Sequence, residues 1–270
     1  MLTVLFWNVG RRSLADRVAR IARGRDADIV LLAECANPGW VTRRLNEQGG
    51  GRYYPSATIS RITIYTRFVP ASVSVLSETN YYSIRELPAI HGIRDSLIVV
   101  AAHLPSKLEV SEQNQIPDAV ELSRAIAAAE DQRGHTRTVL LGDLNMNPFE
   151  FGVSAGAGLH GVMTREIARI GTRTVREREY RFFYNPMWRF FGDGSSGPPG
   201  TYFYWRADEQ CFFWNVFDQV MIRPALLDRF AKDGVEILDS DGTEPLVGTN
   251  GRPDSSRGSD HLPILLRLDV

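Results

Sequence analysis

Short apolar runs, each about as long as one β-strand, end repeatedly in residue types suited to acid–base or metal chemistry. Strand ends hold side chains rigidly at one edge of a sheet, so this pattern predicts packed sheets with a site along a common edge. Taken singly, each residue has a structural alternative: a turn for Asn8, a solvated charge for Glu34, a core imidazole for His103. The recurrence of the pattern favours the functional interpretation. The residues concerned are Asn8, Glu34, His103, Asp143 with Asn145, Asp218, and Asp260 with His261.

The hydrophobic periodicity divides the chain into many short strands and a few helices. Continuous or alternating apolar runs predict strands at 2–8, 28–32, 59–66, 73–76, 82–87, 97–103, 138–141, 201–205, 217–222 and 263–270. Helical spacing predicts helices at 13–23, 38–47 and 118–130, with Ser13 as the N-cap of the first and a short helix from Pro224. The glycine- and proline-containing segments 192–200 and 239–258 are expected to be loops.

This order of elements predicts an α+β fold. We expect a four-layer α/β sandwich, in which two packed, mostly antiparallel β-sheets are flanked by helices. The 270 residues suffice to bury one large core, and neither an internal repeat nor a linker divides them. The sequence therefore predicts one catalytic domain over 1–270, with a variable insertion rich in arginine and aromatic residues at about 152–199.

Composition limits the partners and the location. The formal net charge is -1, so any binding to nucleic acid must depend on local charge. No apolar run is long enough to span a bilayer, and nothing indicates an obligate protein partner. Cys35 and Cys211 lack metal-ligand spacing and are expected to be reduced, and the first residues read as a strand, which together predict a cytoplasmic protein.

Six segments, spread in order over nearly the whole chain, resemble the endonuclease/exonuclease/phosphatase superfamily. That family includes pancreatic-type deoxyribonuclease, abasic-site endonucleases, deadenylases, inositol polyphosphate phosphatases and neutral sphingomyelinases. Two of the segments are moderately specific alone, and all six in order are highly specific. They are Phe6-Trp7-Asn8-Val9, Ala33-Glu34, Ala102-His103-Leu104-Pro105-Ser106, Gly142-Asp143-Leu144-Asn145, Phe217-Asp218-Gln219-Val220 and Ser259-Asp260-His261-Leu262-Pro263.

The resemblance implies a divalent cation and a set of substrate contacts. Glu34, with Asn8 and Asp260, would bind Mg²⁺ or Mn²⁺, which prefer oxygen ligands. Asn8 and Asn145 would also contact the substrate. Arg85 belongs to a segment, residues 85–89, that is similar to pancreatic-type deoxyribonuclease, and it is a further substrate-contact candidate.

The resemblance also implies a catalytic set of five residues. Asp143 would activate the attacking water, while Asn145 holds a phosphate oxygen. His261 would donate to the scissile phosphate, with Asp218 fixing the tautomer of its imidazole. His103 would act as a general acid near the leaving oxygen.

Three departures narrow this resemblance. Gly10 stands where abasic-site endonucleases carry an acidic residue, and His103 stands where they carry a tyrosine. Both departures disfavour an abasic-site role. Pancreatic-type deoxyribonucleases support their histidine with a glutamate, whereas the corresponding segment 59–62 holds no carboxylate, so the strength of His103 as an acid stays open.

A nuclease acting on DNA or RNA is the function we expect. The alternative is a phosphatase or phosphodiesterase acting on a small-molecule or lipid phosphate, such as an inositol phosphate or sphingomyelin. The segment 147–149 lacks the basic residues of inositol phosphatases. A lipid substrate favours an exposed apolar patch, and 202–205 or 212–214 are candidates, although we expect buried strands there. A non-enzymatic binding module is disfavoured because no main site residue is missing.

The arginines of the segment 165–181 allow two interpretations. One interpretation is a substrate lip that binds phosphates. Alternatively, they form a solvated face paired with Glu166, Glu177 and Glu179, while the aromatic residues that follow belong to the core.

Overall fold

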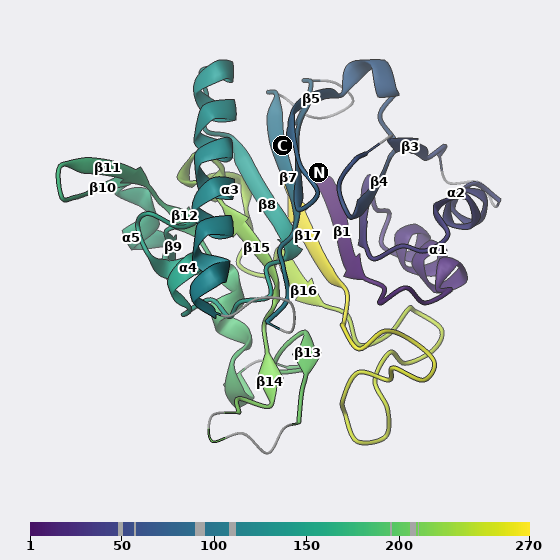
Figure 1. Ribbon diagram of the computed structural model, residues 1–270. Coiled ribbons are helices and arrows are strands. Elements are labelled where there is room, and N and C mark those ends of the chain that lie inside the picture. Colours follow the sequence, from purple (N-terminus) through teal and green to yellow (C-terminus); the bar gives the residue numbers. More distant parts are fainter. Residues whose placement is uncertain are drawn as a thin grey trace.

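The computed structural model describes residues 1–47, 51–56, 58–89, 95–107, 112–194, 196–205, 209 and 211–270. Its elements form four layers: two β-sheets face each other in the centre, and helices cover the outer side of each (Figure 1). This arrangement confirms the fold class predicted from the sequence.

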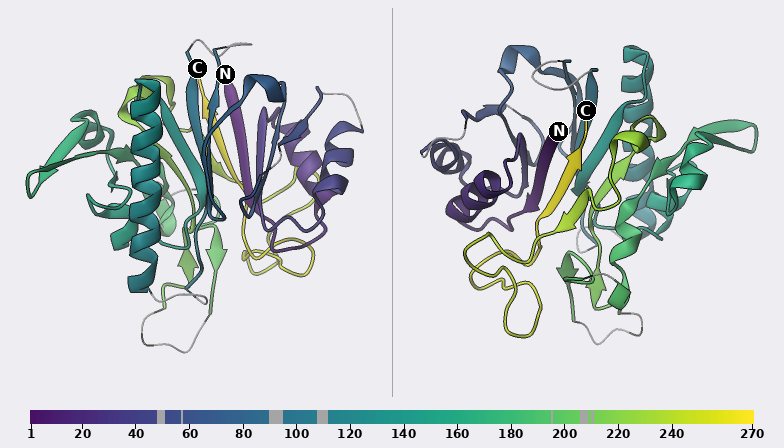
Figure 2. Two further views of the ribbon diagram at one scale, coloured as in Figure 1. Left: turned by 45° about the horizontal axis from the view of Figure 1, so that its top comes forward. Right: turned by 180° about the vertical axis from the view of Figure 1, so that it is seen from behind.

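One sheet has six strands in the order β16-β17-β1-β2-β4-β3. Its neighbours are antiparallel except for β1 and β2. The strands are β1 (Leu2–Asn8), β2 (Ile29–Ala33), β3 (Tyr54–Ser56), β4 (Ile62–Thr66), β16 (Val235–Ile237) and β17 (Ile264–Leu268). Helices α1 (Ala15–Gly24) and α2 (Pro38–Asn46) cover its outer side (Figure 2).

The other sheet has seven strands in the order β5-β6-β7-β8-β15-β12-β9. Its parallel pairs are β7 with β8 and β12 with β9. The strands are β5 (Ser74–Glu78), β6 (Tyr82–Leu87), β7 (Leu97–His103), β8 (Thr138–Asp143), β9 (Gly161–Val162), β12 (Phe183–Tyr184) and β15 (Asp218–Ile222). Helices α3 (Glu112–Arg133), α4 (Phe151–Ser154) and α5 (Arg165–Arg169) lie on its outer side (Figure 1).

Two small hairpins and four 3₁₀ turns complete the structure. The hairpin of β10 (Thr172–Val175) and β11 (Arg178–Arg181) projects from the side of the molecule, beyond α3 and α4. The hairpin of β13 (Tyr202–Phe203) and β14 (Trp214–Asn215) lies at the same end as the loop that precedes β17. The 3₁₀ turns are η1 (Pro70–Ser72), η2 (Pro186–Phe190), η3 (Gly192–Gly194) and η4 (Pro224–Arg229).

The central strands are apolar along their whole length because both of their faces are buried. On β7, Val99 points into the core between the two sheets, whereas Ile98 and Val100 pack toward α3. This alternation is the two-residue period of a strand with a core on each side. Burying one such side chain stabilises the fold by about 1.5–3 kcal/mol, so these strands hold their ends rigidly.

Most predicted strands are observed, and the differences lie at element ends. β1, β6 and β7 have the predicted bounds. Ser13 is not an N-cap: Leu14 occupies that position at α1, and no side chain caps the helix. Part of the segment 152–199 completes the seven-stranded sheet, since β9 and β12 extend it beyond β15. Within the described residues, no helix is long and apolar enough to cross a membrane.

Candidate active site

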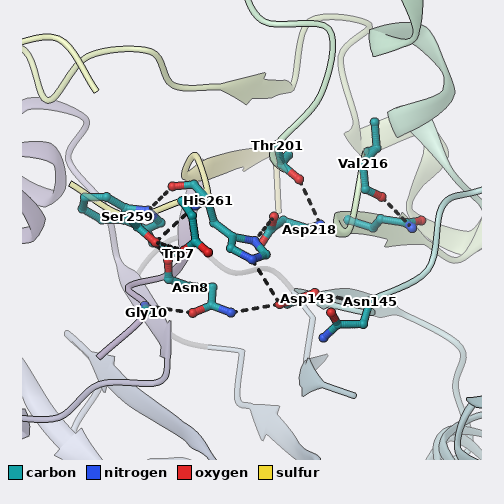
Figure 3. Close-up of polar contacts among 12 residues, drawn as sticks. Trp7, Asn8, Gly10, Asp143, Asn145, Thr201, Val216, Asp218, Ser259 and His261 are labelled. Atoms are coloured by element: carbon teal, nitrogen blue, oxygen red, sulfur yellow. Dashed lines mark hydrogen bonds and ion pairs between the residues drawn. The ribbon is translucent and has the colours of Figure 1, made fainter. Parts of the chain in front are cut away.

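Residues from both sheets meet where the central strands end (Figure 3). His103 is the last residue of β7 and pairs with Asp143, the last residue of β8. Asp143 in turn pairs with Asp218, the first residue of β15. Asn8 ends β1 in the facing sheet. The strand registers therefore place three acid–base groups side by side and bring a fourth polar residue across from them.

Gly142 permits the close approach of β7 and β8 just before Asp143. A Cβ at this position would lie 2.1 Å from the carbonyl oxygen of Ala102. No side chain fits in that space, so the local geometry requires glycine next to the catalytic candidate. Replacing Gly142 would push β8 away from β7 and displace the carboxylate.

The carboxylate of Asp143 is the centre of the polar cluster (Figure 3), and its side chain is 1% exposed. Asn8 Nδ2 donates to its Oδ2 at 2.9 Å, and the Asn145 backbone N–H donates to its Oδ1 at 2.9 Å. The Nε2 atoms of His103 and His261 lie 3.8 and 3.9 Å from Oδ2. Two donors thus fix the orientation of the carboxylate, which leaves one oxygen facing both imidazoles.

His261 is held by a buried carboxylate. The Nδ1 of His261 and the Oδ2 of Asp218 are 2.8 Å apart, and Trp7 Nε1 donates to the backbone carbonyl of His261 at 2.8 Å. Burial disfavours the charged imidazole, but the charges of Asp218 and Asp143 outweigh this and raise the pKa of His261 to about 10. Burial raises the pKa of Asp218, opposed by His261. With Nδ1 engaged by Asp218, Nε2 is the atom that points toward Asp143.

The segment before β17 is anchored on β1. Ser259 Oγ donates to the carbonyl of Asn8 at 2.7 Å and lies 3.3 Å from Asp260 Oδ1. Asn8 Oδ1 accepts from the Gly10 N–H at 3.0 Å. A Cβ on Gly10, which has φ +55°, would lie 3.2 Å from Asp260 Oδ1. Asp260 therefore reaches the turn after β1 and stays exposed beside Asn8.

Glu34 lies on the other side of the same turn. Its backbone has φ +54°, an uncommon conformation for a non-glycine residue. Its side chain is 34% exposed, with Oε1 3.7 Å from His103 Nε2 and Oε2 3.9 Å from Arg11 Nε. The carboxylate is thus turned toward the imidazole and the mouth of the site.

Within the described residues, His103 lacks a carboxylate at its second ring nitrogen like the one that supports His261. Its Nδ1 is buried and has no hydrogen-bond partner within the described residues. This agrees with the lack of a carboxylate in the segment 59–62. The Nε2 atom has two carboxylates near it, those of Glu34 and Asp143, but no hydrogen bond within the described residues fixes the tautomer of the ring.

Asn145 is close to the cluster, although its amide is engaged. Its Nδ2 donates to the carbonyl of Leu104 at 2.9 Å, and its backbone has φ +51°. Gln115 on α3 donates from one Nε2 atom to the carbonyls of Pro105 and Asn145, at 2.8 and 3.2 Å. Gln115 thereby ties together the loops that follow His103 and Asp143.

Arg85 is not brought to the cluster. It lies within β6, opposite Val99, four residues before the end of β7. Its Nε donates to Ser83 Oγ at 3.0 Å, and its Nη2 lies 3.2 Å from Glu78 Oε1. The arginine is buried in this ion pair, away from the mouth of the site.

Two arginines of the segment 165–181 are engaged in ion pairs with residues outside that segment. Arg169 pairs with Asp228 at 2.6 Å, and Arg181 pairs with Glu130 and Asp131. Arg169 ends α5, and Arg181 ends the β10–β11 hairpin, which projects from the side of the molecule (Figure 1). Among the described residues, no ion pair joins either arginine to the predicted partners Glu166, Glu177 and Glu179. The expected core position of Phe182, Phe183 and Phe190 is confirmed, since all three are buried.

The oxygen donors of this site suit a hard divalent cation. Glu34 and Asp260 offer carboxylates at the mouth, and Asn8 offers an amide oxygen beside them. No hydrogen-bond donor within the described residues engages the Glu34 carboxylate, which leaves it available as a ligand. A second grouping, Asp143, Asp218 and His261, has ligand atoms within 4.8 Å of one another. There the 2.8 Å contact of His261 with Asp218 already occupies one ligand of each residue, so we assign that grouping to acid–base work.

Several supporting residues were not identified from the sequence. Thr201 Oγ1 accepts from the Asp218 N–H at 3.1 Å, and its carbonyl accepts from Leu262, so it links the two halves of the histidine–aspartate pair. Gln115 has a similar role for Asn145. Both act through contacts between distant segments, which leave no local sequence pattern. Ser259 lies within a matched segment, and its place beside Asp260 was the only clue.

The fold and this cluster define the class of protein. The sequence pattern of the Endonuclease/Exonuclease/phosphatase family matches residues 5–261. The chain therefore belongs to the endonuclease/exonuclease/phosphatase family, whose members are hydrolytic phosphoesterases. No curated protein matches the chain by sequence.

Solved structures support the same fold at low sequence identity. An AP endonuclease from Archaeoglobus fulgidus is 13% identical with a TM-score of 0.56, covering 100% of both chains. The Neisseria 3′ phosphatase NExo, bound to a product DNA hairpin, is 15% identical with a TM-score of 0.58 and 100% coverage of both chains. ANGEL2, a 2′,3′-cyclic phosphatase, is 14% identical with a TM-score of 0.59, covering 99% of this chain and 94% of its own.

Proposed function

We propose that this protein hydrolyses phosphodiester bonds of nucleic acid with a bound divalent cation, Mg²⁺ or Mn²⁺. The observation that carries the proposal is the buried Asp143 carboxylate, which faces the Nε2 atoms of His103 and His261 at 3.8 and 3.9 Å. The carboxylate and the two imidazoles converge on one point, beside which a phosphate and an attacking water can contact all three groups.

The cation would be held by Glu34 and Asp260, with Asn8 beside them, and would polarise the phosphoryl oxygens. Asp143 accepts a proton from the attacking water, because both of its oxygens are oriented by Asn8 and Asn145. His261 donates from Nε2 to a phosphoryl oxygen as an imidazolium, a form that the neighbouring carboxylates of Asp218 and Asp143 stabilise.

His103 and Asn145 complete the set. His103 Nε2 faces the same space and donates to the leaving oxygen. Asn145 reaches a phosphate oxygen only if its amide leaves the carbonyl of Leu104, to which it donates at 2.9 Å. Arg85 is not part of this mechanism, because it is buried in its pair with Glu78.

We prefer nucleic acid as the substrate because one similar structure is an endonuclease and another is a 3′ phosphatase bound to DNA. The Neisseria protein is bound to a DNA hairpin, and the Archaeoglobus protein is an AP endonuclease. The alternative is a small-molecule or lipid phosphate. An apolar patch at the mouth supports it: Trp205, Phe212 and Phe213 are exposed, not buried as the sequence led us to expect. The half-buried free thiols Cys35 and Cys211 support a cytoplasmic location.

Hydrolysis of a substrate panel tests the proposal. The panel holds single- and double-stranded DNA, RNA, inositol phosphates and sphingomyelin vesicles, each with EDTA, Mg²⁺ or Mn²⁺. The wild-type protein is expected to cut nucleic acid with the metal only, and Asp143→Ala is expected to cut nothing. Metal-dependent activity confined to the inositol phosphates or the vesicles would replace the proposal by its alternative.

A further inference from the structure

Aromatic rings lie next to His261 and along the hairpin that leads from it to the surface. The Tyr202 ring lies 4.6 Å from the His261 ring, 5.4 Å from Phe217 and 6.2 Å from Tyr204. The pairs of Tyr202 with Phe217 and with Tyr204 are stacked, at interplanar angles of 27° and 21°. The rings therefore present roughly parallel faces beside the catalytic imidazole.

A second group of rings lies farther out on the segments that extend the β13–β14 hairpin, and a backbone hydrogen bond connects it to the first group. The Tyr204 N–H donates to the carbonyl of Phe213, and the Phe213 ring lies 5.0 Å from Trp205. Trp205 is 67% exposed and Phe213 is 40% exposed. We call Tyr202, Tyr204, Trp205, Phe213 and Phe217 the aromatic platform. Its inner part is half-buried at the active site, and its outer part is open to solvent.

Cationic side chains lie over rings along this surface. Lys107 Nζ is 5.8 Å from the centre of Phe217, at the inner part. Arg252 lies 5.6 Å from the centre of Trp205 and 4.0 Å from that of Phe203, at the outer part. Figure 1 shows that the loop carrying Arg252 and the β13–β14 hairpin lie at the same end of the molecule. Ring faces interleaved with cations match the alternation of bases and phosphates in a nucleic-acid strand.

We propose that the aromatic platform binds unpaired nucleotides next to the scissile phosphate, so that the substrate is single-stranded nucleic acid or an unpaired end. This rests on the proposed function of the site. Bases in a duplex already stack on each other and hide their faces, whereas unpaired bases can stack on protein rings. Stacking is tolerant of sequence because every base has a π-face, so the platform selects strand state and not sequence.

A lipid surface is the occupant that the charges disfavour. Arg252 and Lys107 lie over ring faces, and Glu150 pairs with Lys107 at 2.7 Å. Insertion of these rings into a bilayer would also remove the paired charges of Lys107 and Glu150 from water, which costs free energy. The two tyrosine hydroxyls add further polar groups to the inner part.

Removal of the outer rings tests the platform without touching the catalytic groups. Trp205→Ala and Phe213→Ala are compared with Trp205→Phe, which keeps a ring. The matched control is Ile170→Ala, because Ile170 is 66% exposed and lies at the end of α5. Binding of a labelled oligothymidylate and of a duplex is measured by anisotropy with Mg²⁺, in an Asp143→Ala background. Hydrolysis of bis(p-nitrophenyl) phosphate by otherwise wild-type proteins measures the catalytic groups alone.

Each alanine variant is expected to bind the oligothymidylate about 10- to 100-fold more weakly. Duplex binding and hydrolysis of the small diester should change little in these variants. Trp205→Phe and the control Ile170→Ala should bind the oligothymidylate about as well as the parent. Equal binding of single strand and duplex by the parent, or unchanged single-strand binding in both alanine variants, overturns the platform. Binding to phosphatidylcholine vesicles that depends on Trp205 and Phe213 also overturns it, in favour of a lipid surface. If the wild-type protein binds the single strand but shows no metal-dependent hydrolysis of nucleic acid, the proposed function is refuted and the platform is not.

Discussion

At the scale of single residues, the site depends on side chains that are held by others. Asp143 is oriented by Asn8 and Asn145, and His261 is oriented by Asp218. A group held in this way loses little entropy when it enters the reaction, which is the physical basis of its efficiency. His103 lacks such support, so we expect it to contribute less than His261.

Asp218→Asn is expected to lower kcat by roughly 10³-fold or more, because the amide can no longer hold the required tautomer of the imidazole. KM should change little, since Asp218 is buried and does not reach the substrate. Steady-state kinetics on a single-stranded oligonucleotide gives both constants. The matched control is Asp254→Asn, which removes a carboxylate that pairs with Arg257 and Ser256 in its own loop. A kcat within a few-fold of wild type would show that Asp218 does not position His261.

Glu34→Gln is expected to raise the Mg²⁺ concentration for half-maximal activity by about 10-fold or more, because an uncharged amide is a weaker ligand for a hard cation. Calorimetric titration with Mn²⁺ should show the same loss of affinity without any substrate. Glu47→Gln is the control, since that carboxylate pairs with Arg43 and Arg44 on α2. An unchanged titration would remove Glu34 from the ligand set.

At the scale of elements, the sequence predicts the parts that local pattern determines. β1 and β7 were predicted with their bounds because continuous apolar runs end there in a polar residue. The positions of Asn8 and His103 follow from those strand ends. By contrast, β9 and β12 have two residues each and exist only through pairing with distant segments. Gln115 could not be identified from the sequence for the same reason, because its contacts depend on α3 lying against two distant loops.

Arg85 shows that a sequence motif alone does not determine where a side chain lies in the fold. Its segment resembles a family pattern, yet the register of β6 places it opposite Val99, within the sheet and beside Glu78. The 202–205 and 212–214 segments show another limit. Aromatic runs of this length indicate buried strands when read alone, whereas here they form a short hairpin with exposed rings.

One buried ion pair links α3 to the seven-stranded sheet. Arg223, which follows β15, donates to Glu130 of α3 at 2.8 Å and to the carbonyls of Arg181 and Phe182 at 3.0 Å. Arg223→Met should lower the free energy of unfolding by about 3–5 kcal/mol, since it leaves the Glu130 charge buried with only Arg181 beside it. Urea denaturation measures the change. Arg169→Met removes an exposed pair and should leave the midpoint nearly unchanged; a similar midpoint in both variants would contradict the assignment.

At the scale of the whole molecule, the two sheets form one rigid support whose central strands end at the site. The net charge of -1 gives no general attraction to a polyanion, so recognition must come from the site and its surroundings. The sequence predicted this four-layer fold because many short apolar runs and a few helical ones follow one another along the chain. The sequence did not predict which rings and charges surround the entrance of the site, because they come together only through the tertiary fold.

Acid is expected to weaken the fold through His160, which is buried against Phe182. Burial and the charge of Arg173 lower its pKa from the ordinary 6.5. The unfolded chain therefore takes up this proton more readily than the folded chain, so stability falls as pH drops below about 6.5. Urea denaturation from pH 7.5 downward measures the slope. His160→Asn, which tolerates the φ of +56°, should flatten the slope; an unchanged slope would assign the acid sensitivity to other groups.

The central claim is that water attacks phosphorus at a site organised around Asp143. Hydrolysis of a single-stranded oligonucleotide in ¹⁸O-labelled water, with Mg²⁺, tests it most directly by mass spectrometry of the products. The account predicts one labelled oxygen in the phosphate of the wild-type product, and no product with Asp143→Ala or with EDTA. Label in the sugar hydroxyl, or labelled phosphate formed at the wild-type rate by Asp143→Ala, would contradict it.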